Sequence, residues 1–253
     1  MRNALAVVSV LIIAALVAVG QYSHIRPSTL HAQAVPARAA DPTTQVKGLG
    51  TLPPGWKMRF DPPSAGKPAP TPEQVSFEPA GSGFHFKTGP AAIYYNPKDM
   101  GSGEYLVSAT FSQKKSMGHE AYGIFIGGKN LQDSTQTYVY LVIKPCRSRG
   151  DCKEAGATLG EVLVSQRTSD GKVVALVPVA HSGLVNVDDP ADGHATNKVA
   201  IHVAKDSIHF IVNDKLAAAI AKSQLNGAST DGQAGLRINH QLDIDVDWKG
   251  VSK

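Results

Sequence analysis

The stretch from Asn197 to Trp248 alternates apolar and polar residues over several short segments. Apolar side chains recur at every second position, which is the period of a half-buried β-strand. The pairs Lys205-Asp206 and Asn213-Asp214 separate the first three segments, and both carry residues that tolerate the positive φ of a two-residue turn. The pattern predicts an antiparallel meander of three strands, followed by two more strands.

Further apolar segments bounded by turn residues predict additional strands upstream, for a total of about twelve or thirteen. Most alternate, but residues 138–143 are apolar on both faces, which favours a central strand whose second face is covered. We therefore expect an all-β fold, an antiparallel two-sheet jelly-roll sandwich with one sheet curved into a groove. The upstream strand candidates are Val75–Glu78, Gly83–Lys87, Ala91–Tyr95, Glu104–Gln113, Ala121–Ile126, Thr137–Lys144, Gly160–Arg167 and Val173–Val179.

The amino-terminal residues differ from the rest in composition. Arg2 precedes an apolar run from Ala4 to Gly20, and a small-residue site follows at Ala32-Gln33-Ala34, as in an export signal. We expect export to the periplasm or the medium, with membrane attachment only if this segment is retained as an anchor. The expected divisions are a signal over residues 1–34, a Pro- and Ala-rich leader over 35–54 and the sandwich over 55–253, with Trp56 docked at one end of the sandwich.

Composition limits the classes of partner. The 253 residues have 18% charged side chains, 24 Gly, 16 Pro and a net charge of +4. This composition suits one large β domain. The basic residues are scattered without interleaved aromatic residues, so nothing in the pattern predicts nucleic-acid binding.

The chain has two cysteines, Cys146 and Cys152, and an oxidising compartment would allow them to form a disulfide. The loop between them contains Arg149-Gly150-Asp151, a tripeptide of adhesive ligands that is also the composition of an ordinary exposed turn.

Histidines are candidates for chemistry. With a two-residue turn at Lys205-Asp206, His202 lies directly across from His209, with the two Cβ atoms about 5 Å apart. Such a pair could bind sugar hydroxyls or a metal, or could pack as part of the sheet. His240 is a further candidate for the same surface.

Acidic residues suggest two other sites. Asp243, Asp245 and Asp247 lie on one strand face at intervals of about 6.5 to 7 Å, and they favour a solvated face, or protection of a sheet edge, over catalysis. Asp188, Asp189 and Asp192 lie in an oxygen-rich loop that could bind Ca²⁺ or form a plain turn. No cofactor is required by either interpretation.

Sugar binding needs aromatic platforms beside hydrogen-bonding groups. The candidates are Tyr94 and Tyr95, which alternation sends to opposite faces so that one is core, together with Tyr122, Tyr138, Tyr140, Asn96, Gln136 and Arg237.

The turn Val212–Leu216, the tail G-L-R-I-N-H-Q-L-D-I-D-V and the segment G-P-A-A-I-Y-Y at Gly89–Tyr95 resemble the concanavalin A-like superfamily of lectin, laminin-G and glucanase domains. Within it they are most similar to exported bacterial domains of the 3-keto-disaccharide hydrolase type. The resemblance implies a groove that faces carbohydrate. It transfers no catalytic residue, because the glucanase motif Glu-x-Asp-x-x-Glu is absent from the sequence.

Three functions follow as hypotheses: an exported carbohydrate-binding protein, a glycoside hydrolase of the 3-keto-disaccharide type, and a structural or adhesive envelope protein. Two facing carboxyl groups in the groove would favour the hydrolase, whereas aromatic residues without an acid pair would favour binding.

Overall fold

A computed structural model describes residues 48–114, 121–145, 159–187, 189, 194–239 and 242–253, all within one compact unit of residues 39–253. The expected export segment, Cys146, Cys152, the loop between them, Asp188, Asp192 and His240 lie outside these residues. Within the described ranges, no helix has the length and apolar composition needed to cross a membrane.

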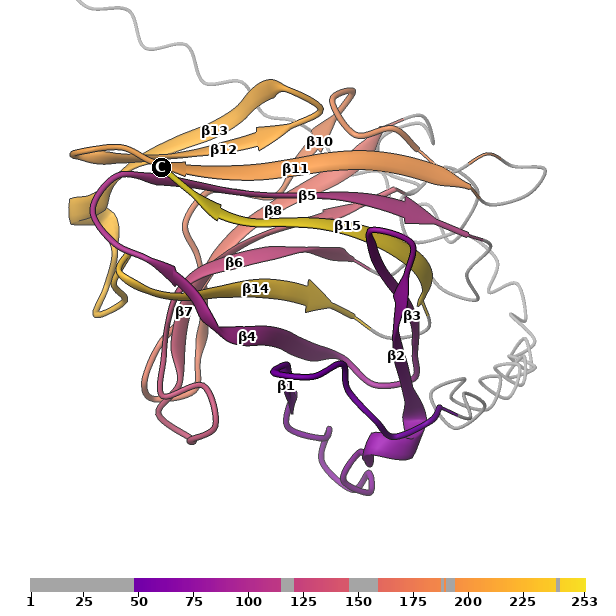
Figure 1. Cartoon of the computed structure of the whole chain (residues 1–253). Coiled ribbons are helices and arrows are strands. Elements are labelled where there is room, and N and C mark those ends of the chain that lie inside the picture. Colours follow the sequence, from indigo (N-terminus) through magenta and orange to yellow (C-terminus); the bar gives the residue numbers. More distant parts are fainter. Residues whose placement is uncertain (1–47, 115–120, 146–158, 188, 190–193, 240–241) are drawn as a thin grey trace, which may run out of the picture. The chain divides into compact units, whose positions relative to one another are not determined.

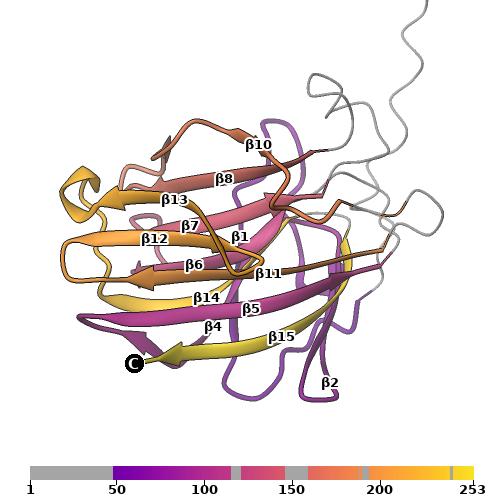
Figure 2. The ribbon, with the colours of Figure 1, turned by 90° about the horizontal axis from the view of Figure 1, so that it is seen from above.

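Two antiparallel sheets form the layers of the fold (Figures 1 and 2). We call them sheet A and sheet B. Sheet A has the order β1 (Lys57–Phe60), β4 (Ala92–Gly101), β14 (Gly232–Ile238), β6 (Tyr122–Lys129), β7 (Thr137–Lys144), β8 (Gly160–Arg167) and β10 (Ala180–Ser182), with β9 (Val173–Ala175) also paired to β8. Sheet B has the order β13 (Lys215–Ala221), β12 (Ser207–Val212), β11 (Ala195–Val203), β5 (Tyr105–Gln113), β15 (Leu242–Ser252), β3 (Gly83–Thr88) and β2 (Val75–Ala80). Two short 3₁₀ turns, η2 (Pro72–Gln74) and η4 (Lys222–Gln224), complete the regular structure.

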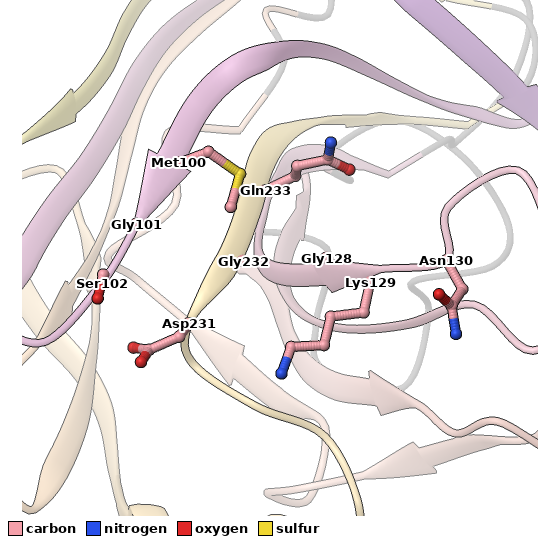
Figure 3. A pocket seen from close by; sticks show the side chains of 9 residues that line it. All are labelled: Met100, Gly101, Ser102, Gly128, Lys129, Asn130, Asp231, Gly232 and Gln233. Atoms are coloured by element: carbon pink, nitrogen blue, oxygen red, sulfur yellow. The ribbon is translucent and has the colours of Figure 1, made fainter.

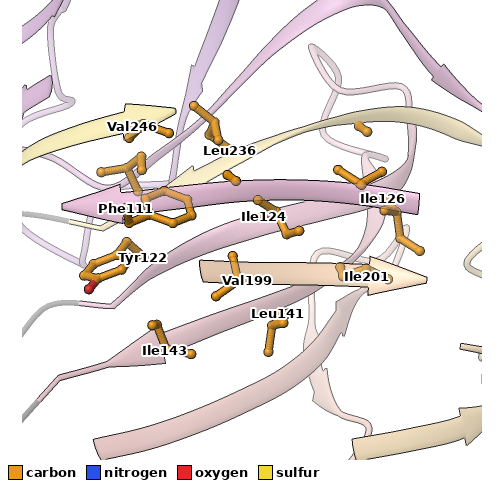
Figure 4. Close-up of a cluster of buried hydrophobic side chains, with 14 of the residues drawn as sticks. Phe111, Tyr122, Ile124, Ile126, Leu141, Ile143, Val199, Ile201, Leu236 and Val246 are labelled. Atoms are coloured by element: carbon orange, nitrogen blue, oxygen red, sulfur yellow. The ribbon is translucent and has the colours of Figure 1, made fainter. Parts of the chain in front are cut away.

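The core lies between the two sheets, as the alternation predicts. Phe111 and Val246 of sheet B meet Ile124, Leu141 and Leu236 of sheet A, and all are buried (Figure 4). Burying one large apolar side chain contributes roughly 1.5 to 3 kcal/mol. The inward positions of both sheets therefore supply the main stabilisation, and the outward positions are free to carry other chemistry.

An aromatic cluster fills one end of this core. Trp56 makes edge contacts with Phe77 at 5.2 Å and Phe84 at 4.9 Å between ring centroids, and Phe77 stacks on Phe86 at 4.1 Å. The expected docking of Trp56 is confirmed. Residues 48–54, expected in the leader, also join the fold, because Gly48 N donates to the carbonyl oxygen of Glu73.

The meander has the expected register. His202 pairs with His209 in β11 and β12, and Val212 pairs with Lys215 across the next turn. Asn213 and Asp214 have φ of 49° and 63°, as a tight turn of this kind requires. Lys205-Asp206 also forms a two-residue turn, but neither residue has positive φ, so that part of the prediction is wrong.

Two strand predictions needed correction. The expected strand Val173–Val179 divides into β9 and β10, which pair with opposite ends of β8, and Pro178 lies between them. Proline has no N–H to donate to a ladder, which explains the break. The described residues form fifteen strands, since β1, which directly follows the expected leader, was also not predicted.

The aspartate row of β15 has the predicted alternation. Leu242, Ile244 and Val246 are buried, while the intervening aspartates are half-buried on the outer face of sheet B. The suggestion that these aspartates guard a sheet edge is wrong, because β15 lies between β5 and β3.

Candidate functional site

The outer face of sheet A carries a second, smaller cluster of buried side chains that does not belong to the core. Ile93, Tyr95, Phe125 and Tyr138 form it with Leu131, and Tyr140 packs beside it half-exposed. Alternation along each strand turns these residues away from the core. The same face also carries three arginines. We call this surface the tyrosine–arginine face, defined by Tyr95, Tyr138, Tyr140, Arg59, Arg167 and Arg237.

Arg237 of β14 forms a two-pronged ion pair with Asp61, which follows β1. Its Nη1 donates to Asp61 Oδ1 at 2.9 Å, and its Nη2 donates to Oδ2. The Arg237 side chain is 12% exposed and that of Asp61 is 30% exposed. Burial alone would lower the pKa of Arg237, but the Asp61 carboxylate outweighs burial and raises it. The pair therefore stays charged and fixes two side chains from distant parts of the sequence.

Tyr138 lies where these charges converge. Burial raises the pKa of its phenol, and the opposing charges of Arg237 and Asp61 act on it as well. A raised pKa keeps the hydroxyl protonated near neutral pH, so it can both donate and accept a hydrogen bond. The ring of Tyr140 lies 5.8 Å from that of Tyr138, and Tyr140 is the more exposed of the two.

The loop of residues 130–136, between β6 and β7, is tied to both sides of this face. Gln132 Nε2 donates to Tyr95 Oη at 2.8 Å, and Arg59 donates to the backbone oxygen of Gln132. With the amide of Gln136 oriented to satisfy its neighbours, its oxygen accepts from Arg59 Nε at 3.0 Å and from Arg167 Nε at 3.3 Å.

These bonds show that sheet A is curved. Arg59 belongs to β1 and Arg167 to β8, and four strands lie between them. In a flat sheet such strands would be about 24 Å apart, at about 4.8 Å per neighbouring pair. Both arginines nevertheless reach the oxygen of Gln136. The tyrosine–arginine face is therefore concave, as expected for one sheet of the predicted sandwich.

A shallow pocket of about 480 Å³ lies at the end of this sheet where β4, β6 and β14 meet (Figure 3). Met100, Gln233 and Lys129 contribute side chains from these three strands, and Asn130 follows at the start of the loop. Gly128 lies on its wall, where a Cβ would come within 3.0 Å of Phe125 and Leu131. The pocket thus borders the smaller cluster.

Two carboxylates of this face are engaged by basic side chains. Asp61 binds Arg237, and Glu161 of β8 lies 3.9 Å from Lys144. A glycosidase needs two carboxyl groups on either side of the scissile bond. Among the described residues, the face offers aromatic and cationic groups rather than such an acid pair.

The sequence candidates divide between three places. Tyr95, Tyr138, Tyr140 and Arg237 gather on the tyrosine–arginine face. Tyr122 instead lies fully buried between the sheets, where its hydroxyl accepts from Asn197 and its ring lies 5.0 Å from that of Phe111. Tyr94 is also core, so the predicted division between Tyr94 and Tyr95 is confirmed.

His202 and His209 lie on the outer face of sheet B, in the other layer. Their ring centroids are 5.5 Å apart at an angle of 62°, and Ser207 Oγ lies 3.1 Å from His209 Nε2. The structure therefore does not bring the histidine pair together with the tyrosines.

The remaining candidate sites are acidic. Asp189 is exposed, and within the described part of the chain no three His, Cys, Asp or Glu side chains are grouped as metal ligands. On the outer face of sheet B, His85 Nδ1 lies 2.6 Å from Asp245 and its Nε2 lies 3.4 Å from Asp243, so these carboxylates take part in a local ion network.

Sequence reasoning did not identify Arg59, Asp61, Gln132 or Arg167. Their contacts depend on strand pairings between distant segments, and the only local signal was the outward position of Arg167 in a clear strand.

No protein-family model matches the sequence, and no curated protein is significantly similar to it. Solved structures do match. A protein of unknown function with a galectin-like fold from Bacillus subtilis has a TM-score of 0.50 at 10% identity, with 78% of this chain and 88% of that chain covered. Carbohydrate-binding module CBM66 from Bacillus subtilis has a TM-score of 0.49 at 10% identity, covering 78% and 93%. A Bacteroides ovatus GH16 protein in complex with G4G4G3G product has a TM-score of 0.49 at 9% identity, covering 78% and 93%.

These similarities concern the fold, because the identities are low. The chain has a galectin-like fold, a jelly roll of two antiparallel sheets, as the sequence pattern predicted.

Proposed function

We propose that this is an exported carbohydrate-binding protein and that the tyrosine–arginine face is its ligand surface. The observation that carries the proposal is the position of half-exposed Tyr140 beside buried Tyr138 and the Asp61–Arg237 pair on a concave face. The C–H face of a sugar ring stacks on an aromatic ring, and sugar hydroxyls need fixed donors and acceptors. Both requirements are met within one small area.

Structural neighbours that include a carbohydrate-binding module and a glycoside hydrolase are consistent with this use of the fold, although the fold alone does not assign it. Export rests on the apolar stretch Ala4–Gly20. Calcium dependence stays a prediction from the acidic loop 186–193, so binding should be measured both with Ca²⁺ and with a chelator.

The test is a glycan array followed by calorimetric titration of the best glycan. Tyr140→Ala should weaken binding about tenfold, the effect of losing one stacking platform worth about 1.4 kcal/mol. His209→Ala on sheet B is the matched control and should bind like the original protein. If His209→Ala loses binding while Tyr140→Ala retains it, the binding site lies on sheet B and our assignment of the site to sheet A is wrong. Absence of binding to any glycan, with or without Ca²⁺, would refute the function itself.

A further inference from the structure

The contact of Arg59 and Arg167 with Gln136 holds two positive charges against one neutral oxygen. Arg59 also donates to the backbone oxygen of Gln132, which is likewise uncharged. The structure gives neither guanidinium a carboxylate partner among the described residues. This contrasts with Arg237 on the same face, whose charge is balanced by Asp61.

Such an arrangement is unfavourable in the unliganded protein. The Arg167 residue is only 9% exposed and Gln136 is 2% exposed, so water screens the two charges poorly. Two positively charged guanidinium groups that are close together and poorly solvated repel each other, and a buried charge without a counter-ion is destabilising. Groups held at such an energetic disadvantage cluster at functional sites.

The terminal nitrogens of Arg167 remain available for a ligand. Among the described side chains, the fully buried polar atoms without a hydrogen-bond partner are Tyr94 Oη, Asn239 Oδ1 and Asp243 Oδ1. Neither terminal nitrogen of Arg167 has a hydrogen bond to another residue that the structure describes, and neither is among these atoms, so both retain contact with the surface. The guanidinium is held at its Nε, and its outer edge stays open.

We propose, resting on the carbohydrate-binding role above, that the saccharide carries an anionic group which binds between Arg59 and Arg167. The fitting groups are the carboxylate of a uronic acid and a sulfate ester, because the planar fork of arginine donates two parallel hydrogen bonds to such oxygens. Half-exposed Tyr140 packs against buried Tyr138 on the same face and is placed to contact the sugar ring that carries the anion.

The test compares one oligosaccharide in charged and neutral forms. Calorimetric titration compares tetragalacturonate with its fully methyl-esterified form, in which each carboxylate is replaced by a neutral ester and one methyl group is added. We expect tetragalacturonate, or a sulfated glycan if the array selects one, to bind at least tenfold more tightly than its neutral counterpart. Equal binding, or preference for the neutral form, would overturn the inference and leave carbohydrate binding intact. Failure of every glycan would remove both proposals together.

Inorganic sulfate and free glucuronate identify the source of the anion. If either binds as tightly as the oligosaccharide, the pair is a simple anion site, and the assignment to a glycan is wrong. Weaker binding of these small anions supports a group carried on a sugar chain.

Two substitutions separate binding from structural support. Arg167→Gln should reduce affinity for the charged ligand at least tenfold and affinity for the neutral ligand much less, whereas Lys205→Gln on an exposed turn removes the same charge without effect on either. Gln136→Glu supplies an internal counter-ion, so it should raise the thermal unfolding midpoint and weaken binding of the charged ligand. The Gln136→Glu variant also provides the test if the Arg167→Gln variant does not fold. A raised midpoint with undiminished affinity would mean that the two arginines only hold the loop, and it would overturn the proposal.

Discussion

The Asp61–Arg237 pair shows how one contact links separate parts of the tyrosine–arginine face. Asp61 follows edge strand β1, whereas Arg237 lies on β14, two strands further into sheet A. The pair positions the segment after β1 against the sheet and leaves part of the Asp61 carboxylate exposed. A residue that anchors the fold thus also presents acceptor oxygens to a ligand.

Removal of the carboxylate tests its structural part. Asp61→Asn leaves the mostly buried Arg237 charge without a counter-ion, and we expect the free energy of unfolding to fall by about 2 kcal/mol, less than for a fully buried pair. Urea denaturation gives this value. Asp170→Asn is the control, since Asp170 pairs with Lys172 on an exposed turn and should have little effect. An Asp61→Asn variant as stable as the original protein would show that the pair serves the ligand alone.

Some residues of the face could be selected from the sequence because their chemistry is local. Tyr138 and Tyr140 lie in a segment that is apolar on both faces, and such a pattern already indicates a covered strand. Arg59 and Arg167 could not be paired in this way. They meet only because sheet A curves across four intervening strands, and nothing near either residue encodes that pairing.

At the level of elements, the β12–β13 turn is held by its own asparagine. Asn213 Nδ2 donates to the backbone oxygen of Leu184 at 2.7 Å and to Asn197 Oδ1 at 2.9 Å, while its Oδ1 accepts from Lys198 N at 2.8 Å. Asn197 is fully buried. The turn therefore combines a left-handed backbone with a buried polar network, and both features favour asparagine.

Two substitutions separate these features. Asn213→Gly removes the side-chain bonds but suits a φ of 49°, whereas Asn213→Ala removes the bonds and also strains the backbone. Asn213→Ala should cost about 1 kcal/mol more in unfolding free energy than Asn213→Gly. Chemical denaturation measures the difference. The control is Lys205, where φ is negative, so Gly should be no better than Ala. Equal costs at Asn213 would mean that the backbone conformation imposes no constraint.

The strand pairings that sequence reasoning located are those between neighbours along the chain. The register of His202 and His209 follows from a two-residue turn, because the turn length fixes which residues face each other. The curvature of sheet A and the position of β15 inside sheet B depend on distant pairings, and local periodicity does not specify them.

At the scale of the whole molecule, an ion network on the outer face of sheet B makes the free energy of unfolding depend on pH. His85 and Lys114 both contact Asp245, and Asp243 and Lys87 complete the group. Burial raises the pKa of Asp245, but hydrogen bonds from His85 and Lys114 outweigh burial, so the pKa is lowered. A lowered folded-state pKa contributes stability that is complete above the unfolded value of about 3.9 and is lost as the pH falls through the folded value.

Asp245→Asn should therefore be less stable than the original protein at neutral pH and lose less stability in acid. The two proteins should converge once the pH has fallen below the lowered folded-state pKa of Asp245, where the carboxyl group is protonated in both the folded and the unfolded state. Thermal unfolding midpoints between about pH 2 and 7 give the comparison, with Asp206→Asn on an exposed turn as the control. Parallel curves for Asp245→Asn and the original protein would contradict a stabilising role for this carboxylate.

The position of β15 has a consequence for the order in which sheet B assembles. β15 (Leu242–Ser252) is the most C-terminal of the described strands, yet it lies between β5 and β3 and joins them in one sheet. Sheet B is therefore complete only after β15 has paired on both sides with strands from much earlier in the sequence. Long-range pairing of this kind forms slowly. The two parts of sheet B should therefore join late in folding, in the single step that inserts β15 between them.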